Sequence, residues 1–449
     1  MDPDRLERFA FVPGPGAVPL AIERAEGAYL YTPDGRAILD AAGGAIVANV
    51  GHGRREVVEA AAAAMQETSY VVPVFATPSR LALVERLRER WLPDALTRIF
   101  LTSGGSESMD AALRLARQFH VARGEPGRWK MIGRELSYHG TTVATLAAGG
   151  HEKRRAPFGP LLYDWPKAPA CFCLRCPLDK TYPGCATACA DALDEVLTRE
   201  GPETVAAFVA EPVVGSTIGA ADPPDEYWPR VAEICRRHGV LLIADEVMTG
   251  FGRTGRRFGV EHWNVTPDIL VGGKGLAGGY APIGGVYTTE EVVGSLAKNG
   301  DELMFYTFGA HPSACGAAEK VLEILERESL VARAAEMGEK LRKRLAGLES
   351  HPNVAQIRGR GLMLGIELVR DRGTLAPFPA DAGLTRKVVA AGLGEGVFFY
   401  PCGSGSVRDA VMLGPPFVIG DAEIEKIVGA LEAAIDTAVQ WAEREASSR

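Results

Sequence analysis

The sequence has no excess of positive charge and no long apolar run. Lysine and arginine together number 49 against 57 aspartates and glutamates, which gives a formal net charge of −8. A general nucleic-acid-binding protein would need a basic face, so this class is disfavoured. No apolar run reaches the roughly 18–20 residues that span a bilayer, and the polar, acidic residues 1–8 are unlike a secretory signal. We therefore expect a cytoplasmic protein that binds neither nucleic acid nor membrane.

The remaining composition is that of an ordinary globular protein. The chain has 449 residues, of which 47% are hydrophobic and 24% charged, enough for about two or three domains and a large core. Apolar strand-like segments alternate with helical patterns such as 108–118 and 226–238. The strand-like segments are residues 98–101, 129–132, 204–210, 240–244 and 269–271. This alternation predicts an α/β protein with a mainly parallel sheet that is covered by helices on both faces.

Both ends of the chain lie outside this alternating block. Residues 27–32 and 37–40 have the pattern of short strands, joined by the turn sequence Pro33-Asp34-Gly35. After about residue 313, two helical patterns lead to an α+β segment that ends in an amphipathic helix. We expect one small domain built from both chain ends. The predicted boundaries are 1–60 and 325–449 for the small domain and 61–324 for the large domain.

A single lysine, Lys274, follows the strand-like run 267–271 among glycines. Asp245 follows another apolar run, 241–244. A lysine and an aspartate at the mouths of two strands suit an aldehyde cofactor with a basic ring nitrogen, because the amine forms a Schiff base and the carboxylate holds the pyridinium. The alternative is a solvated surface lysine and an aspartate that caps a helix.

Three further motifs follow strand-like segments. Glycines and hydroxyls in Ser103-Gly104-Gly105-Ser106 open a helix, where backbone N–H groups and the helix dipole favour an anion. An aromatic ring at Tyr138, in Tyr138-His139-Gly140, could stack on a flat cofactor. Glu211 ends a strand at the edge where open α/β sheets bind ligands. Each motif also has an ordinary structural explanation: a tight turn, a core aromatic residue or a capping carboxylate.

Taken together, the motifs resemble those of the class III pyridoxal-phosphate-dependent aminotransferases, the omega-transaminase group of fold type I. The resemblance extends from about Gly27 to about Trp441, and the run 245–255 followed by Lys274 is its most specific part. It rests on the following motifs in this order: Ser103-Gly104-Gly105-Ser106-Glu107, Tyr138-His139-Gly140, Glu211-Pro212, Asp245-Glu246-Val247 and Gly273-Lys274-Gly275. The resemblance implies a fold type I enzyme with pyridoxal 5'-phosphate (PLP) as its cofactor.

The resemblance also implies roles for the catalytic residues. Lys274 would be the Schiff-base lysine and the base that moves the substrate's proton. Asp245 would hold the pyridinium nitrogen through a charge-assisted hydrogen bond, which contributes on the order of 1.5–3 kcal/mol. Glu211 matches a glutamate of the family that lies near the cofactor ring.

The remaining cofactor-binding roles fall on five residues. Val247 and Tyr138 would pack on opposite faces of the ring, and Gly105 and Ser106 would hold the phosphate. Thr307 matches a threonine that reaches the phosphate in a neighbouring subunit. The resemblance therefore implies a homodimer with shared active sites.

The chain departs from the family at the position that recognises a carboxylate. Members that bind an α-carboxylate commonly carry an arginine three residues before a pair of prolines near the C-terminus. In this chain the pair is Pro415-Pro416, and the position is occupied by Met412. This difference favours amines or omega-amino acids over ornithine-like substrates.

A cysteine-rich segment, predicted as a loop inserted at 168–190, is a second departure. Its thiols have a spacing compatible with zinc or an iron–sulfur cluster, with Cys171 to spare. The four predicted ligands are Cys173, Cys176, Cys185 and Cys189. The alternatives are a disulfide, disfavoured in a reducing cytosol, and uncoordinated thiols packed in the loop.

The leading hypothesis for function is an aminotransferase. It would move an amino group from an amine or omega-amino acid to a keto acid such as pyruvate or 2-oxoglutarate. An amino-acid racemase, an epimerase or an aminomutase would use the same lysine and aspartate and stays an alternative. A regulatory or scaffold protein that keeps the fold without catalysis is disfavoured, because the set Lys274, Asp245 and Ser106 is complete.

Overall fold

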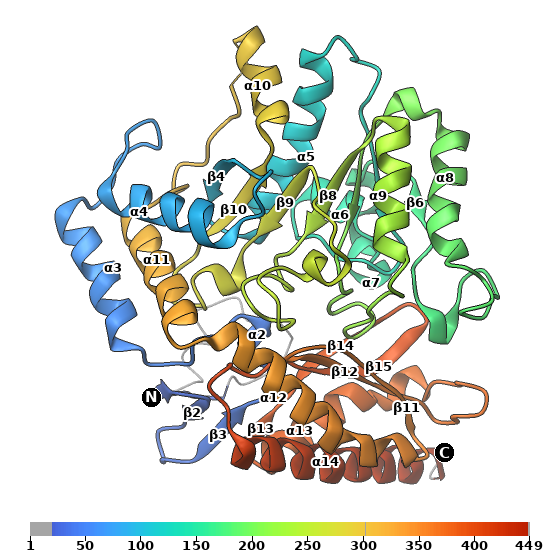
Figure 1. Ribbon diagram of the computed structural model, residues 1–449. Helices are drawn as coiled ribbons and strands as arrows, with labels where there is room; N and C mark the ends of the chain where they lie inside the picture. The colour runs from blue at the N-terminus through green and yellow to red at the C-terminus, as the bar shows by residue number, and fades with distance from the viewer. Residues whose placement is uncertain (1–19, 301, 448–449) are drawn as a thin grey trace.

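The computed structural model describes residues 20–300 and 302–447, so the expectation for residues 1–8 lies outside the described part. Figure 1 shows a larger part built on a central sheet and, below it, a smaller part. The smaller part contains the blue N-terminal strands and the red C-terminal helix α14 (Asp421–Ser447). Within the described ranges, no helix has the length and apolarity needed to cross a membrane.

The large sheet has seven strands and is mixed. Its strands in spatial order are β4 (Arg98–Thr102), β10 (Gly284–Thr288), β9 (Ile269–Gly272), β8 (Leu241–Asp245), β7 (Val205–Ala210), β5 (Lys130–Arg134) and β6 (Lys167–Ala168). The five strands from β9 to β6 are parallel, whereas β10 runs antiparallel to both β4 and β9. The α/β prediction is therefore confirmed. Strands β6 and β10 were not predicted from the sequence, because β6 has only two residues and β10 begins with two glycines and has no continuous apolar run.

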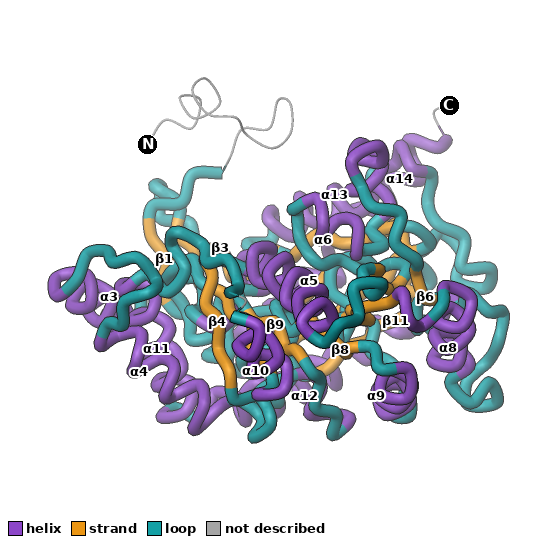
Figure 2. Tube along the Cα trace, turned by 90° about the horizontal axis from the view of Figure 1, so that it is seen from above, coloured by secondary structure: helices purple, strands orange, loops and turns teal. Residues whose placement is uncertain are grey.

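Helices cover both faces of this sheet, as Figure 2 shows for α5 (Gly105–Ala122) and α9 (Tyr227–His238). Successive residues of a strand point to opposite faces. Along β8, Leu241 and Ile243 accordingly join the buried cluster that contains the apolar face of α5. Leu242 and Ala244 join the cluster that contains α9. Burial on both sides explains why residues 241–244 of this strand are all apolar.

The other helices frame this core. Helix α11 packs against α3 and α4 and leads out of the large domain toward α12. Their bounds are α2 (Gly43–Ile46), α3 (Arg55–Glu67), α4 (Pro78–Arg86), α6 (Val143–Ala148), α7 (Glu152–Arg155), α8 (Ala188–Glu200), α10 (Glu290–Asn299), α11 (Pro312–Arg327) and α12 (Leu330–Leu345).

The smaller part contains two short sheets. One is antiparallel, with the order β11 (Val354–Arg360), β12 (Met363–Leu368), β15 (Val407–Leu413) and β14 (Tyr400–Ser404). The other has the order β1 (Arg24–Glu26), β2 (Tyr29–Tyr31), β3 (Ala37–Asp40) and β13 (Val397–Phe398). Helices α13 (Leu384–Gly394) and α14 pack against each other beside these sheets.

The parallel pairing of β3 with β13 joins the two ends of the chain, with Leu39 opposite Val397. The small domain therefore contains strands from both ends, as the fold class predicts. The exact boundaries at residues 60 and 324 stay a prediction.

Candidate active site

The predicted site residues converge at one edge of the large sheet. The carboxyl ends of parallel strands meet at the same edge, so β8 places Asp245 there. Glu211 directly follows β7, and Lys274 follows β9 after one glycine. A cavity of about 180 Å³ lies at this edge. It is lined by Gly105, Ser106, Tyr138, His139, Gly140, Glu211, Ser216, Asp245, Val247, Met248 and Lys274.

Lys274 is held in an uncommon backbone conformation beside this cavity. Its φ of 43° lies in the left-handed region, which a non-glycine residue adopts only when its surroundings impose it. Burial lowers the pKa of the Lys274 amine to about 8. The negative charge of Asp245 opposes this shift, and the positive charge of Arg253 adds to it. A substantial fraction of the amine is therefore neutral near pH 8, and the neutral amine is the nucleophilic form.

Asp245 is fixed by two hydrogen bonds. It is 5% exposed, and its Oδ2 lies 2.8 Å from Nδ1 of His139. Its Oδ1 accepts a hydrogen bond of 3.1 Å from the backbone N–H of Val247. The His139 ring is itself buried, and its Nε2 has no hydrogen-bond partner among the described residues. His139 therefore orients the carboxylate that faces the cavity.

Gly105 and Ser106 form the part of the cavity wall that would bind an anion, and we call these two residues the anion cradle. Gly105 begins the 18-residue helix α5, where the backbone N–H groups and the helix dipole favour an anion. A Cβ at Gly105 would lie 2.7 Å from Cγ1 of Val247, so the site requires glycine. The Ser106 hydroxyl accepts a hydrogen bond of 3.2 Å from the N–H of Thr141. This contact ties the cradle to the loop that carries Tyr138.

Glu211 holds the same loop through hydrogen bonds to backbone N–H groups. Its Oε2 accepts a hydrogen bond of 3.4 Å from the N–H of Tyr138, and its Oε1 accepts one of 3.1 Å from the N–H of Gly215. Burial raises the pKa of the Glu211 carboxyl. These contacts position the Tyr138 ring at the cavity, and the predicted catalytic role of Glu211 stays a prediction.

Thr307 is the one predicted cofactor residue that does not line the cavity. It is exposed on a turn at residues 307–310. Its predicted partner is the phosphate in another subunit, so its role stays a prediction.

The sequence analysis assigned no role to His139, Ser216 or Met248. The motif Tyr138-His139-Gly140 marked the position of the histidine. Nothing in the sequence paired His139 with Asp245, which lies 106 residues further along the chain. The tertiary structure makes that pairing.

These residues fit a pyridoxal-type cofactor. The cavity offers a reactive lysine, a carboxylate fixed by His139, an anion cradle that admits only glycine at position 105, and an aromatic ring. When bound, such a cofactor supplies an electron sink and carries the amino group between substrates. Fold and site together define a PLP-dependent enzyme of fold type I.

The chain belongs to the class-III aminotransferases, because the family model "Aminotransferase class-III" matches residues 12–435. It is 35% identical to a taurine–pyruvate aminotransferase of Rhodobacter capsulatus, covering 93% of this chain and 91% of that one. It is 34% identical to a putrescine–pyruvate aminotransferase of Pseudomonas aeruginosa, covering 91% of this chain and 88% of that one. A PLP-bound amine transaminase from an uncultivated Pseudomonas species superimposes with a TM-score of 0.90 at 36% identity, covering 96% and 98% of the two chains.

The cysteine loop between β6 and α8 does not support the predicted metal site. Cys173, Cys176, Cys185 and Cys189 do line one small cavity of about 20 Å³. Ligands of zinc must converge on one point at about 2.3 Å, and no three His, Cys, Asp or Glu side chains of the described residues are grouped to hold a metal ion. Cys171 and Cys189 lie 3.4 Å apart at their Sγ atoms, as free thiols. Among the described residues, the arrangement of these thiols therefore gives no support to a zinc or iron–sulfur site.

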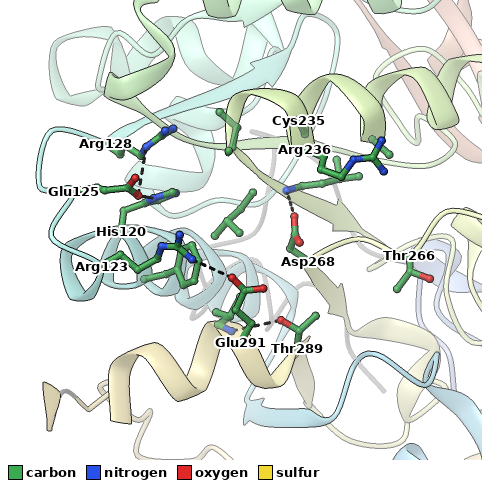
Figure 3. Close-up of a pocket in the computed structure, with 17 residues that line it drawn as sticks. His120, Arg123, Glu125, Arg128, Cys235, Arg236, Thr266, Asp268, Thr289 and Glu291 are labelled. Carbon is green, nitrogen blue, oxygen red and sulfur yellow. Dashed lines mark hydrogen bonds and ion pairs between the residues drawn. The ribbon is translucent and has the colours of Figure 1, made fainter. Parts of the chain in front are cut away.

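A separate cavity of about 370 Å³ lies at the opposite edge of the large sheet, near the start of β8 (Figure 3). Several of its charged groups are paired with one another. Arg123 bonds to Glu291 at 3.0 Å, and His120 lies 2.9 Å from Glu125. This cavity contains none of the predicted site residues.

The lowered pKa of Lys274 predicts how cofactor uptake depends on pH. In the cofactor-free protein, we expect the rate of PLP uptake to rise with pH up to about pH 8 and then to level off, because the neutral amine reacts. An ordinary lysine would extend the rise to about pH 10. Stopped-flow absorbance measures the rate, with Lys274→Arg as the unreactive control. A rise that continues to the higher pH would contradict the assignment.

The fixed carboxylate predicts the effect of Asp245→Asn. Loss of a charge-assisted hydrogen bond should weaken PLP binding by about 10-fold to 100-fold. Fluorescence titration of the cofactor-free protein measures the Kd. Asp268→Asn is the matched control, because this aspartate lies at the opposite edge of the sheet and accepts from the N–H of Leu242. Equal losses in both variants would show that the effect is structural.

Proposed function

We propose that the protein transfers the amino group of a primary amine or omega-amino acid to pyruvate. The observation that carries this proposal is the convergence of Lys274 and Asp245 in one cavity with an anion cradle. The relatives named for taurine–pyruvate and putrescine–pyruvate transfer support the choice of pyruvate as acceptor. A cytoplasmic location is part of the same proposal.

In this proposal Lys274 moves the proton at the substrate carbon that bears nitrogen. A pKa of about 8 suits this role, because a general base works best when its pKa lies near the operating pH. Asp245 would hold the ring nitrogen of the cofactor with its fixed negative charge. Tyr138 closes one side of the cavity and excludes water from the reacting atoms.

The donor class follows from the position of Met412. This side chain is fully buried and belongs to the hydrophobic core of the small domain. It lies on β15, opposite Tyr400 and Gly365. Position 412 therefore offers no polar group to a substrate, in line with amine or omega-amino acid donors.

We also propose that the enzyme is a homodimer with shared active sites. Apolar side chains surround Thr307: Met304 is 67% exposed, Phe305 49% and Phe308 61%. The ring of Tyr70, also exposed, lies 6.1 Å from that of Phe308, centroid to centroid. An exposed apolar group of this kind marks a protein interface. Its position beside Thr307 supports a partner whose active site receives this residue.

A donor screen tests the activity. With pyruvate as acceptor, the PLP-loaded enzyme should convert taurine, β-alanine or putrescine to the matching aldehyde and form alanine in equal amount, as measured by chromatography. Lys274→Ala should lose this activity by several orders of magnitude, because it removes the proton-transferring base. Racemisation of an amino acid without any acceptor, with no alanine formed, would overturn the proposal in favour of a racemase.

Light scattering tests the assembly. We expect a particle of about twice the 47.9 kDa chain. Phe308→Glu should shift it toward the monomer and weaken PLP retention, because a charge would be buried in the interface. Trp441→Glu is the control, since Trp441 is 41% exposed on α14, away from Thr307. A wild-type monomer with full activity would exclude the shared site.

A further inference from the structure

A second, larger cavity adjoins the cofactor cavity and shares Ser216 with it. Its volume is about 530 Å³, and we call it the interdomain cavity. The large domain contributes residues 151–154, which include most of α7. The small domain contributes residues between 380 and 386 and the β14–β15 hairpin.

The interdomain cavity is positively charged, although the whole chain has a net charge of −8. Four cationic side chains face two carboxylates. The cations are Lys153, Arg154, Arg386 and Arg408, and the carboxylates are Glu152 and Asp409. Among the described residues, no salt bridge joins either carboxylate to any of the four cations. A local excess of positive charge next to a cofactor site attracts an anionic substrate.

Arg154 contacts a residue that lines the cofactor cavity. Its guanidinium carbon lies 4.4 Å from the centroid of the Tyr138 ring. Tyr138 lines the cofactor cavity, whereas Arg154 lines the interdomain cavity, so one aromatic ring joins the two. This cation–π contact holds the guanidinium beside the ring of Tyr138, and a guanidinium has five N–H donors, more than one contact with Tyr138 uses. The positive charge of Arg154 also contributes to the lowered pKa of Lys274.

The other cations are less well placed. Arg408 donates from Nη1 to the carbonyl of Phe378, a bond of 2.7 Å. Arg386 lies on α13, on the far wall of the interdomain cavity. Met412 is buried in the small-domain core. Arg154 is therefore the arginine of this lining that the structure places in contact with a residue of the cofactor cavity.

We propose that Arg154 determines substrate specificity by binding the carboxylate or sulfonate of the substrate. It binds the carboxylate of the acceptor keto acid and, in turn, the acidic end of an omega-amino acid or aminosulfonate donor. This inference rests on the proposed function and adds the substrate class, namely amines and keto acids with an acidic group a short distance from the reacting carbon.

Half-reactions test this role, with the amine donors added to the PLP-loaded enzyme and pyruvate added to the enzyme loaded with pyridoxamine phosphate. For Arg154→Ala, the half-saturating concentration should rise by about tenfold or more for taurine, β-alanine and pyruvate, because one charge-assisted hydrogen bond is lost. Benzylamine, which has no acidic group, should change by less than about twofold on the same scale. The change in cofactor absorbance gives both values. Equal effects on taurine and benzylamine, or no effect on either, would overturn the proposal.

Two further variants separate geometry from charge and from folding. Arg154→Lys keeps the charge without the planar fork and should fall between the wild type and Arg154→Ala. Arg199→Ala is the matched control, because Arg199 is an arginine with a 64% exposed side chain at the end of α8 that lines neither cavity. Its constants should equal those of the wild type. If Arg154→Ala is poorly folded by its melting temperature, Arg154→Gln replaces it.

Binding of an unreactive anion tests Arg154 independently of turnover. Calorimetry with propionate and methanesulfonate should give binding to the wild-type holoenzyme and to Arg199→Ala, and about tenfold weaker binding to Arg154→Ala. Unchanged binding in Arg154→Ala would refute the role of Arg154. If the wild type forms no alanine from any donor, the proposed aminotransfer fails, and the anion-binding comparison still decides the role of Arg154.

Discussion

The site depends on the parallel pairing of β8 with β7 on one side and β9 on the other. Parallel strands end at a common edge, and their buried apolar residues hold them in register. That edge brings together Glu211, Asp245 and Lys274, which come from three separate segments of the chain. Their backbones are fixed by the core of the large domain, so the chemical groups need little further ordering to face one cavity.

Burial then sets the chemistry of the converged groups. Removal from water lowers the pKa of Lys274 to about 8 and raises that of Glu211. Asp245 is held by His139 and by the N–H of Val247, so its negative charge has a fixed position. Outside the cofactor cavity, the cation–π contact between Arg154 and Tyr138 places a positive charge beside a ring that lines this cavity.

Elements whose environment restricts the type of residue could be predicted from the sequence. Strands β7 and β8 are buried on both faces, and they are apolar along their whole length except for Asp245 at the end of β8. The motif around Gly105 could be predicted as a cofactor-binding turn, because only glycine fits beside Val247 and the sequence shows this glycine directly. Strand β10 was not predicted, because Gly284 and Gly285 carry no strand pattern. The cysteine spacing predicted a metal site that the arrangement of the thiols does not support, because spacing along a loop does not determine where side chains point.

The sequence by itself therefore indicated the enzyme family, five of the seven strands of the central sheet and the positions of Lys274 and Asp245 at strand ends, since each leaves a local pattern of residue types. Only the tertiary structure decided the partners of these residues. The contacts between His139 and Asp245 and between Arg154 and Tyr138 depend on how distant segments pack. The interdomain cavity likewise forms only where the two domains are in contact, and no local sequence pattern predicts that contact.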